Sequence, residues 1–142
     1  MIEFNSENDF VIKNKKKVRD WLLLVTQKEG KELGELGYVF CSDEYLYNIN
    51  IEYLNHDTLT DIITFDYCTE DIISGEIYIS TDRVAENGKA FNVKFTHELA
   101  RVMVHGLLHL CGYPDKTLDE KRTMRGLEDK YIAMIDVDFL YE

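Results

Sequence analysis

The strongest constraint on the fold is an apolar helical segment that ends at a glycine. From Val102 to Cys111 the chain reads VMVHGLLHLC, with no charged side chain other than possible histidinium. A helix without a polar face is buried on most sides, so we expect the rest of the chain to pack around it. Gly112 is placed to end this helix through a left-handed cap, and Pro114 prevents its continuation. The pattern predicts a central helix over 92–111.

Further helices are predicted on both sides of this segment. Apolar residues at helical spacing indicate a first helix around Trp21, and Asp43 opens a second helical stretch. Thr117 and Glu120 form a capping-box pattern that begins a last helix. The residues expected to face the core from these three helices are Val18, Trp21, Leu22, Val25, Leu46, Ile49, Tyr53, Met124, Leu127, Tyr131 and Ile135.

Strands are predicted where apolar and β-branched residues alternate with polar ones. These stretches are 36–40, 61–67 and 73–80, with the last two expected as hairpin neighbours at a sheet edge. No repeat or linker interrupts the 142 residues, so we expect one α+β domain over 1–142 with a short acidic tail at 136–142.

Composition limits where the protein works and what it binds. The N-terminus lacks the basic start and apolar run of a signal peptide, and no apolar segment is long enough to span a membrane. Three cysteines without a CxxC pair indicate free thiols in a reducing compartment, so a cytoplasmic protein is expected. A net charge of −11 repels polyanions, so nucleic-acid binding would need a local basic patch.

The segment HGLLHLCGYPD carries a candidate metal site. His105 and His109 are four residues apart, which places both imidazoles on one face of a helix. The helix stop lets Asp115 supply an oxygen from outside the helix. Three protein ligands leave one position of a Zn²⁺ ion open for an acidified water, so hydrolysis is the expected chemistry. The competing interpretation is a pair of partly buried histidines without a ligand role.

A zinc peptidase of the HExxH type is a weaker alternative. Its general base is a glutamate directly after the first histidine, and that position is Gly106 here. Glu98, seven residues before His105, lies on nearly the same helix face and is the only nearby substitute that the helix offers.

The same segment resembles the YbeY-type bacterial rRNA maturation factors, whose hallmark is similar to HGxLHLxGYDH. Residues 60–65 (TDIITF) resemble the family's PTDVLSF strand, and residues 75–80 (GEIYIS) resemble its GDIxIS strand. The resemblance implies a small mixed β-sheet packed with helices around the metal-ligand helix. It also implies a single-strand-specific, metal-dependent endoribonuclease that acts on rRNA or a ribosomal subunit.

Two departures from the family pattern affect the site. Without a gap, the family's third histidine falls on Asp115, which keeps a ligand but makes ions other than zinc plausible. A one-residue insertion would instead put Lys116 there, and a protonated lysine cannot ligate. The family's loop before the first of these strands is shortened to residues 55–61, which removes its arginine.

Several cations are candidates to replace that arginine at the substrate. Arg101 lies one turn before His105, although a salt bridge with Glu98 or a neighbour competes for it. A cluster of basic residues also follows the site. This cluster is either a phosphate-binding patch or a solvated helix face, and it consists of Lys116, Lys121, Arg122 and Arg125.

The sequence therefore predicts an endoribonuclease of rRNA maturation and ribosome quality control, with one divalent ion, most simply Zn²⁺. The catalytic group expected is metal-bound water, with no general acid identified and no DNA or membrane partner. A noncatalytic ribosome-assembly factor with a structural metal is the alternative from another class.

Overall fold

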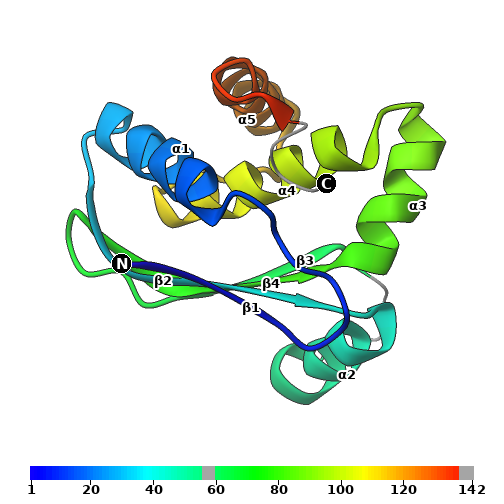
Figure 1. Cartoon of the computed structure of the whole chain (residues 1–142). Helices are drawn as coiled ribbons and strands as arrows, with labels where there is room; N and C mark the ends of the chain where they lie inside the picture. The colour runs from blue at the N-terminus through cyan, green and yellow to red at the C-terminus, as the bar shows by residue number, and fades with distance from the viewer. Residues whose placement is uncertain (56–59, 138–142) are drawn as a thin grey trace.

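Strands and helices are mixed along the chain. The computed structural model describes residues 1–55 and 60–137 (Figure 1). In chain order the elements are β1 (Ile2–Ser6), α1 (Lys15–Lys28), β2 (Glu32–Cys41), α2 (Asp43–Leu54), β3 (Ile62–Asp66), β4 (Ile72–Ser80), α3 (Thr81–Phe91), α4 (Phe95–Leu110) and α5 (Leu118–Ile132).

The described strands form one mixed sheet in the order β1-β2-β4-β3. β2 pairs in parallel with both β1 and β4, whereas β3 and β4 form an antiparallel pair. The predicted hairpin and its place at the sheet edge are therefore confirmed. The α+β class with a small mixed sheet is confirmed as well.

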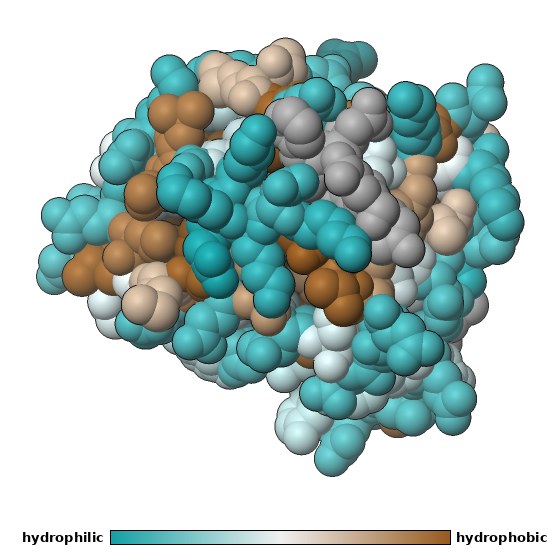
Figure 2. Space-filling model, viewed as in Figure 1, coloured by the Kyte–Doolittle hydropathy of each residue, from teal (hydrophilic) through white to brown (hydrophobic). Residues whose placement is uncertain are grey.

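The two faces of the sheet are covered unequally (Figure 1). α1, α3, α4 and α5 lie on one face, and α2 lies on the other. The larger core fills the space between the sheet and α4, while Cys41, Leu46 and Ile63 form a smaller cluster under α2. Seen from the same side in Figure 2, hydrophilic side chains cover most of the surface, and apolar ones gather on the side of α1.

α4 is the buried central helix that the sequence predicts. Leu99, Met103 and Leu107 have no solvent exposure. Gly106 allows α4 to lie directly on the sheet, because a Cβ there would come within 2.9 Å of Ile62 Cδ1 and 3.0 Å of Ile77 Cγ2. The helix begins at Phe95 instead of Asn92, since Asn92 has a left-handed conformation that ends α3.

Two elements were absent from the sequence prediction. β1 exposes most of its five residues, so it shows no clear alternation. α3 buries one large apolar side chain, Val84, and carries Gly88 in its interior, where glycine lowers helix propensity. One core assignment was also wrong, because Tyr53 is 65% exposed near the end of α2.

Cys41 is buried, Cys68 and Cys111 are half-buried, and all three are free. No helix in residues 1–55 and 60–137 has the length and apolar character to cross a membrane. Most of the expected acidic tail, residues 138–142, lies outside the described residues.

Candidate metal centre

The two histidines expected to bind metal lie on one face of α4 near its C-terminal end. His105 and His109 are one turn apart, and their rings meet edge to face with centroids separated by 4.5 Å. Both side chains are half-buried. The helix directs its apolar residues into the core and leaves this face accessible.

The chain reverses direction immediately after α4. Gly112 adopts a φ of +106°, a conformation that favours glycine. Its N–H donates to the His109 carbonyl, and the Tyr113 N–H donates to the Leu108 carbonyl, which closes the helix as a Schellman motif. The Tyr113 hydroxyl then donates to Glu29 at 2.6 Å and ties the following loop to α1.

This reversal brings Asp115 against both imidazoles. Its Oδ2 lies 3.2 Å from His105 Nε2 and 3.4 Å from His109 Nε2. Donors held at about 2.0–2.2 Å around a tetrahedral ion lie roughly 3.3–3.6 Å apart, so the spacing fits a shared cation. Among the described residues these three form the only group of histidine, cysteine or acidic side chains close enough to hold one metal ion. Lys116 is exposed and does not join it.

A buried glutamate orients the first histidine. Glu128 of α5 places Oε2 2.7 Å from His105 Nδ1, and a carboxylate accepts the Nδ1–H proton. This tautomer leaves the Nε2 lone pair facing Asp115. Arg101 fixes Glu128 in turn, with Nη1 2.8 Å from Oε1, and its Nη2 lies 2.7 Å from Asp129. A carboxylate held in this way fixes the orientation and tautomer of a histidine that can bind a metal.

Arg101 is therefore engaged with α5. The alternative that Arg101 forms a salt bridge is confirmed, but its partners are Glu128 and Asp129 instead of Glu98. Its side chain is only 11% exposed. Arg101 holds Glu128 and also lines the larger cavity, so its contact with a phosphate stays a prediction.

The acids around His105 change the pKa of its imidazole. Burial lowers the pKa of this imidazole, but the hydrogen bond and charge of Glu128 outweigh it, with smaller contributions from Asp115 and Asp61. The net effect raises the pKa of His105 above its ordinary value. The site is thus rich in negative charge, as a cation-binding site requires.

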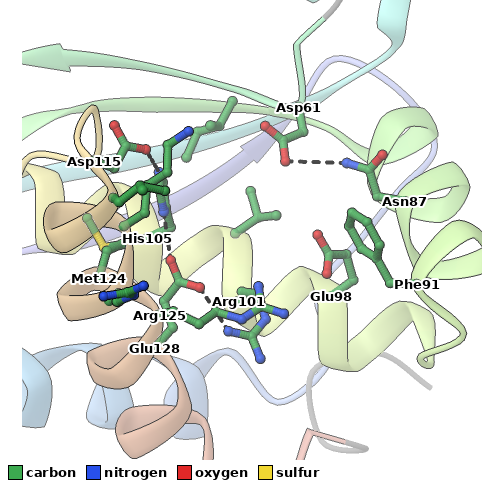
Figure 3. A pocket seen from close by; sticks show the side chains of 15 residues that line it. Asp61, Asn87, Phe91, Glu98, Arg101, His105, Asp115, Met124, Arg125 and Glu128 are labelled. Atoms are coloured by element: carbon green, nitrogen blue, oxygen red, sulfur yellow. Dashed lines mark hydrogen bonds and ion pairs between the residues drawn. The ribbon is translucent and has the colours of Figure 1, made fainter.

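The centre lies between two cavities. The larger, of about 580 Å³, is lined by α3, α4 and α5 and includes Asp61, Glu98 and His105 (Figure 3). The second, of about 440 Å³, opens toward α2 and β3 and shares His105 and Asp115 with the first. His105 and Asp115 therefore border both cavities, and His109 borders the second.

The predicted basic residues divide into two groups. Lys121, Arg122 and Arg125 line the larger cavity from α5, whereas Lys116 is not among its lining residues. Arg122 is largely exposed and lies 3.7 Å from Asp119, so an acid is interspersed on this face. The shortened loop falls largely on residues 56–59, outside the described part of the chain.

Sequence reasoning missed Glu128 and the part of the larger cavity formed by Asp61 and Asn87. Glu128 is 23 residues from His105 and stands in a helix with many charges. Asn87 is on α3, which was not predicted. Only the crossing of α4 and α5 brings Glu128 to the histidine, so no local signal marks it.

Taken together, fold and site define a small α+β protein with a candidate three-ligand metal centre at the end of a buried helix. The chain belongs to the endoribonuclease YbeY family, whose model, described as Endoribonuclease YbeY, matches residues 1–136.

Relatives and a solved structure agree with this assignment. A protein of Flavobacterium johnsoniae named Endoribonuclease YbeY is 53% identical over 97% of this chain and 99% of its own length. One of Christiangramia forsetii with the same name is 48% identical over 96% of each chain. The solution structure of TM1509 from Thermotoga maritima matches with a TM-score of 0.67 at 29% identity, covering 93% of this chain and 87% of that one.

These matches favour neither of the alternatives from the sequence. The relatives are named as nucleases, which are hydrolases, and not as peptidases or assembly factors. The position of a peptidase glutamate is Gly106, which packs on the sheet with no room for a larger side chain.

Proposed function

We propose that this protein is a metal-dependent endoribonuclease that cuts single-stranded RNA during rRNA maturation in the cytoplasm. The observation that carries the proposal is the group of three donors, His105, His109 and Asp115, open to cavities on two sides. A strand that crosses such a centre has nucleotides on both sides of the bond to be cut. The family name of its relatives gives the reaction class.

His105, His109 and Asp115 would hold the ion, which we take to be Zn²⁺ because two imidazoles and one carboxylate suit it. When bound, a divalent ion supplies Lewis-acid polarisation of a phosphoryl oxygen and acidifies water. Glu128 keeps the Nε2 lone pair of His105 directed at the site, and Arg101 holds Glu128.

The cations of α5 offset the unfavourable charge of the whole molecule. At −11 the protein repels RNA at long range. Lys121, Arg122 and Arg125 line the larger cavity and would contact phosphates there. Their contribution makes cleavage sensitive to salt, since phosphate contacts weaken as ionic strength rises.

A circular single-stranded RNA tests the proposal. The protein is stripped with chelator, reloaded with Zn²⁺, Mn²⁺ or Mg²⁺ in separate reactions, and incubated with circular RNA, duplex RNA and single-stranded DNA. We expect linearisation of the circle in at least one metal-loaded sample, and no cutting of duplex RNA or DNA. His109→Ala should be inactive, while Lys15→Ala on the exposed start of α1 should match the parent.

The result that would refute the proposal is an intact circle with every metal, in samples whose metal content is stoichiometric. Retention of a tightly held ion under those conditions would instead favour a structural metal.

A further inference from the structure

The larger cavity contains a buried acid that the metal centre does not use. Glu98 is only 4% exposed, yet among residues 1–55 and 60–137 its side chain makes no hydrogen bond or ion pair. Figure 3 shows its carboxylate facing the same space as Asp61, whose Oδ2 has a long 3.5 Å contact with Asn87 Nδ2.

The Glu98 carboxylate lines the cavity, and its oxygens are not among the described atoms that are fully buried without a hydrogen-bond partner, so a ligand in the cavity can reach them. Burial, and then the charge of Asp61, raise the pKa of the Glu98 carboxyl. Burial also raises the pKa of Asp61. Ionised carboxylates only accept hydrogen bonds, so two acids that line one cavity suit a ligand that donates hydrogen bonds to them.

The walls of the cavity suit a flat, partly apolar ligand. Ile62, Val102 and Met124 line it, and Phe91 stands at its edge with 60% of its surface exposed. Single-stranded RNA is read in this way, with bases stacked on aromatic side chains and hydrogen-bonded along their Watson–Crick edges. A carboxylate accepts hydrogen bonds from the donor groups of a base.

The separation of Glu98 from His105 and the charges lining the cavity suit one nucleotide bound beside the metal centre. Glu98 precedes His105 by seven residues on α4, an axial rise of about 10 Å, which is about the length of a nucleotide from its phosphate to the far edge of its base. Cations from α5 line the cavity and are available to phosphate, and Asp61 and Glu98 line it and are available to base donors.

We infer that this cavity binds one nucleobase next to the cut and that Glu98 selects guanine there. Guanine offers adjacent N1–H and N2–H donors to one carboxylate, whereas uracil offers one donor between two acceptors. The inference rests on the proposed function for its substrate, and it adds the base identity and the residue that reads it.

Cleavage of matched oligonucleotides tests the selection. Single-stranded RNAs that differ at one position, with guanine, inosine, adenine, cytosine or uracil, are cut by the parent, by Glu98→Gln and by Glu86→Gln, a surface control on α3. We expect the parent to cut beside guanine at least about tenfold faster than beside uracil, and inosine, which lacks the N2 amine, to lose most of that advantage.

Glu98→Gln should lose the preference for guanine while it cuts the uracil substrate within about twofold of the parent rate. Glu86→Gln should keep the preference. Equal rates for all five bases in the parent, or an unchanged preference in Glu98→Gln, would overturn the inference. Reduced metal content in Glu98→Gln would also overturn it, since Glu98 would then belong to the metal centre.

A binding measurement separates this inference from the proposed function. Titration of the metal-loaded parent with GMP, IMP and UMP does not require cleavage. Tighter binding of GMP, lost in Glu98→Gln, supports the base pocket even if no RNA is cut. Equal affinities for the three nucleotides refute the base pocket even if RNA is cut.

Discussion

Replacing Glu128 with glutamine should weaken metal binding without disturbing any metal ligand. Glu128 accepts from His105 Nδ1 at 2.7 Å and contacts Arg101 Nη1 at 2.8 Å. A glutamine of the same shape has one acceptor for these two donors. Its amide nitrogen must therefore face either the imidazole N–H or the guanidinium, and His105 loses a charged acceptor.

The expected size of the effect follows from the contact that is lost. A hydrogen bond to a charged group is worth about 1.5–3 kcal/mol. Loss of a second-shell partner typically lowers metal affinity about 10- to 100-fold, and this equals about 1.4–2.7 kcal/mol. We therefore expect the Kd for Zn²⁺ to rise about 10- to 100-fold in Glu128→Gln.

Competition with a chromophoric chelator at pH 7.5 measures this change. Asp129→Asn is the matched control, because Asp129 also contacts Arg101 but not His105, and its side chain is 60% exposed. We expect Asp129→Asn to stay within about twofold of the parent. A Kd for Glu128→Gln within twofold of the parent, or an equal loss in both variants, would refute the second-shell role.

The pH dependence of metal binding should also differ between the parent and Glu128→Gln. The raised pKa of His105 means that protons compete with the metal at a higher pH than an ordinary histidine would allow. Without the charge of Glu128 the pKa of His105 should fall, so the pH below which the measured Kd begins to rise should be lower in Glu128→Gln than in the parent, although the Kd of the variant is higher at pH 7.5. In the metal-free parent, the stability from protonated His105 is present below its unfolded pKa and lost as pH rises through the folded value.

Three further predictions concern the loop and the glycines. Elemental analysis should show substoichiometric metal in Asp115→Ala, whereas Lys116→Ala should match the parent and Asp115→His should retain the ion. Loss of metal in Lys116→Ala but not in Asp115→Ala would instead align Lys116 with the family's third histidine. Gly106→Ala should lower the free energy of urea unfolding by about 1–3 kcal/mol because its Cβ meets the sheet, whereas Gly126→Ala, with open space in α5, should raise it by about 0.5–1 kcal/mol. Gly112→Ala should cost about 1–2 kcal/mol through its positive φ, and no loss in the same urea assay would contradict the capping argument.

The sequence predicts α4 and its end well because the information there is local. The apolar second half of α4, a glycine with positive φ and a capping box at Thr117 are each determined by neighbouring residues. The capping box is present as predicted, with Glu120 N–H donating to the Thr117 hydroxyl.

The elements that depend on distant contacts could not be predicted. β1 exists because β2 offers it a parallel edge, and its own residues are largely exposed. Glu128 looks like any other acid on α5 until the packing of α4 against α5 buries it beside His105. The acids of the larger cavity come from three separated segments, so no spacing rule connects Asp61, Glu98 and Glu128.

The loop that carries Asp115 is anchored at both ends by residues that do not bind metal. Tyr113 donates to Glu29 on one side, and the Thr117 cap holds the other. The side chain at position 115 therefore supports no part of the scaffold. Aspartate and histidine codons differ by a single base, so one mutation can exchange the proposed third ligand, and with it the preference for one metal over another, while the fold stays the same.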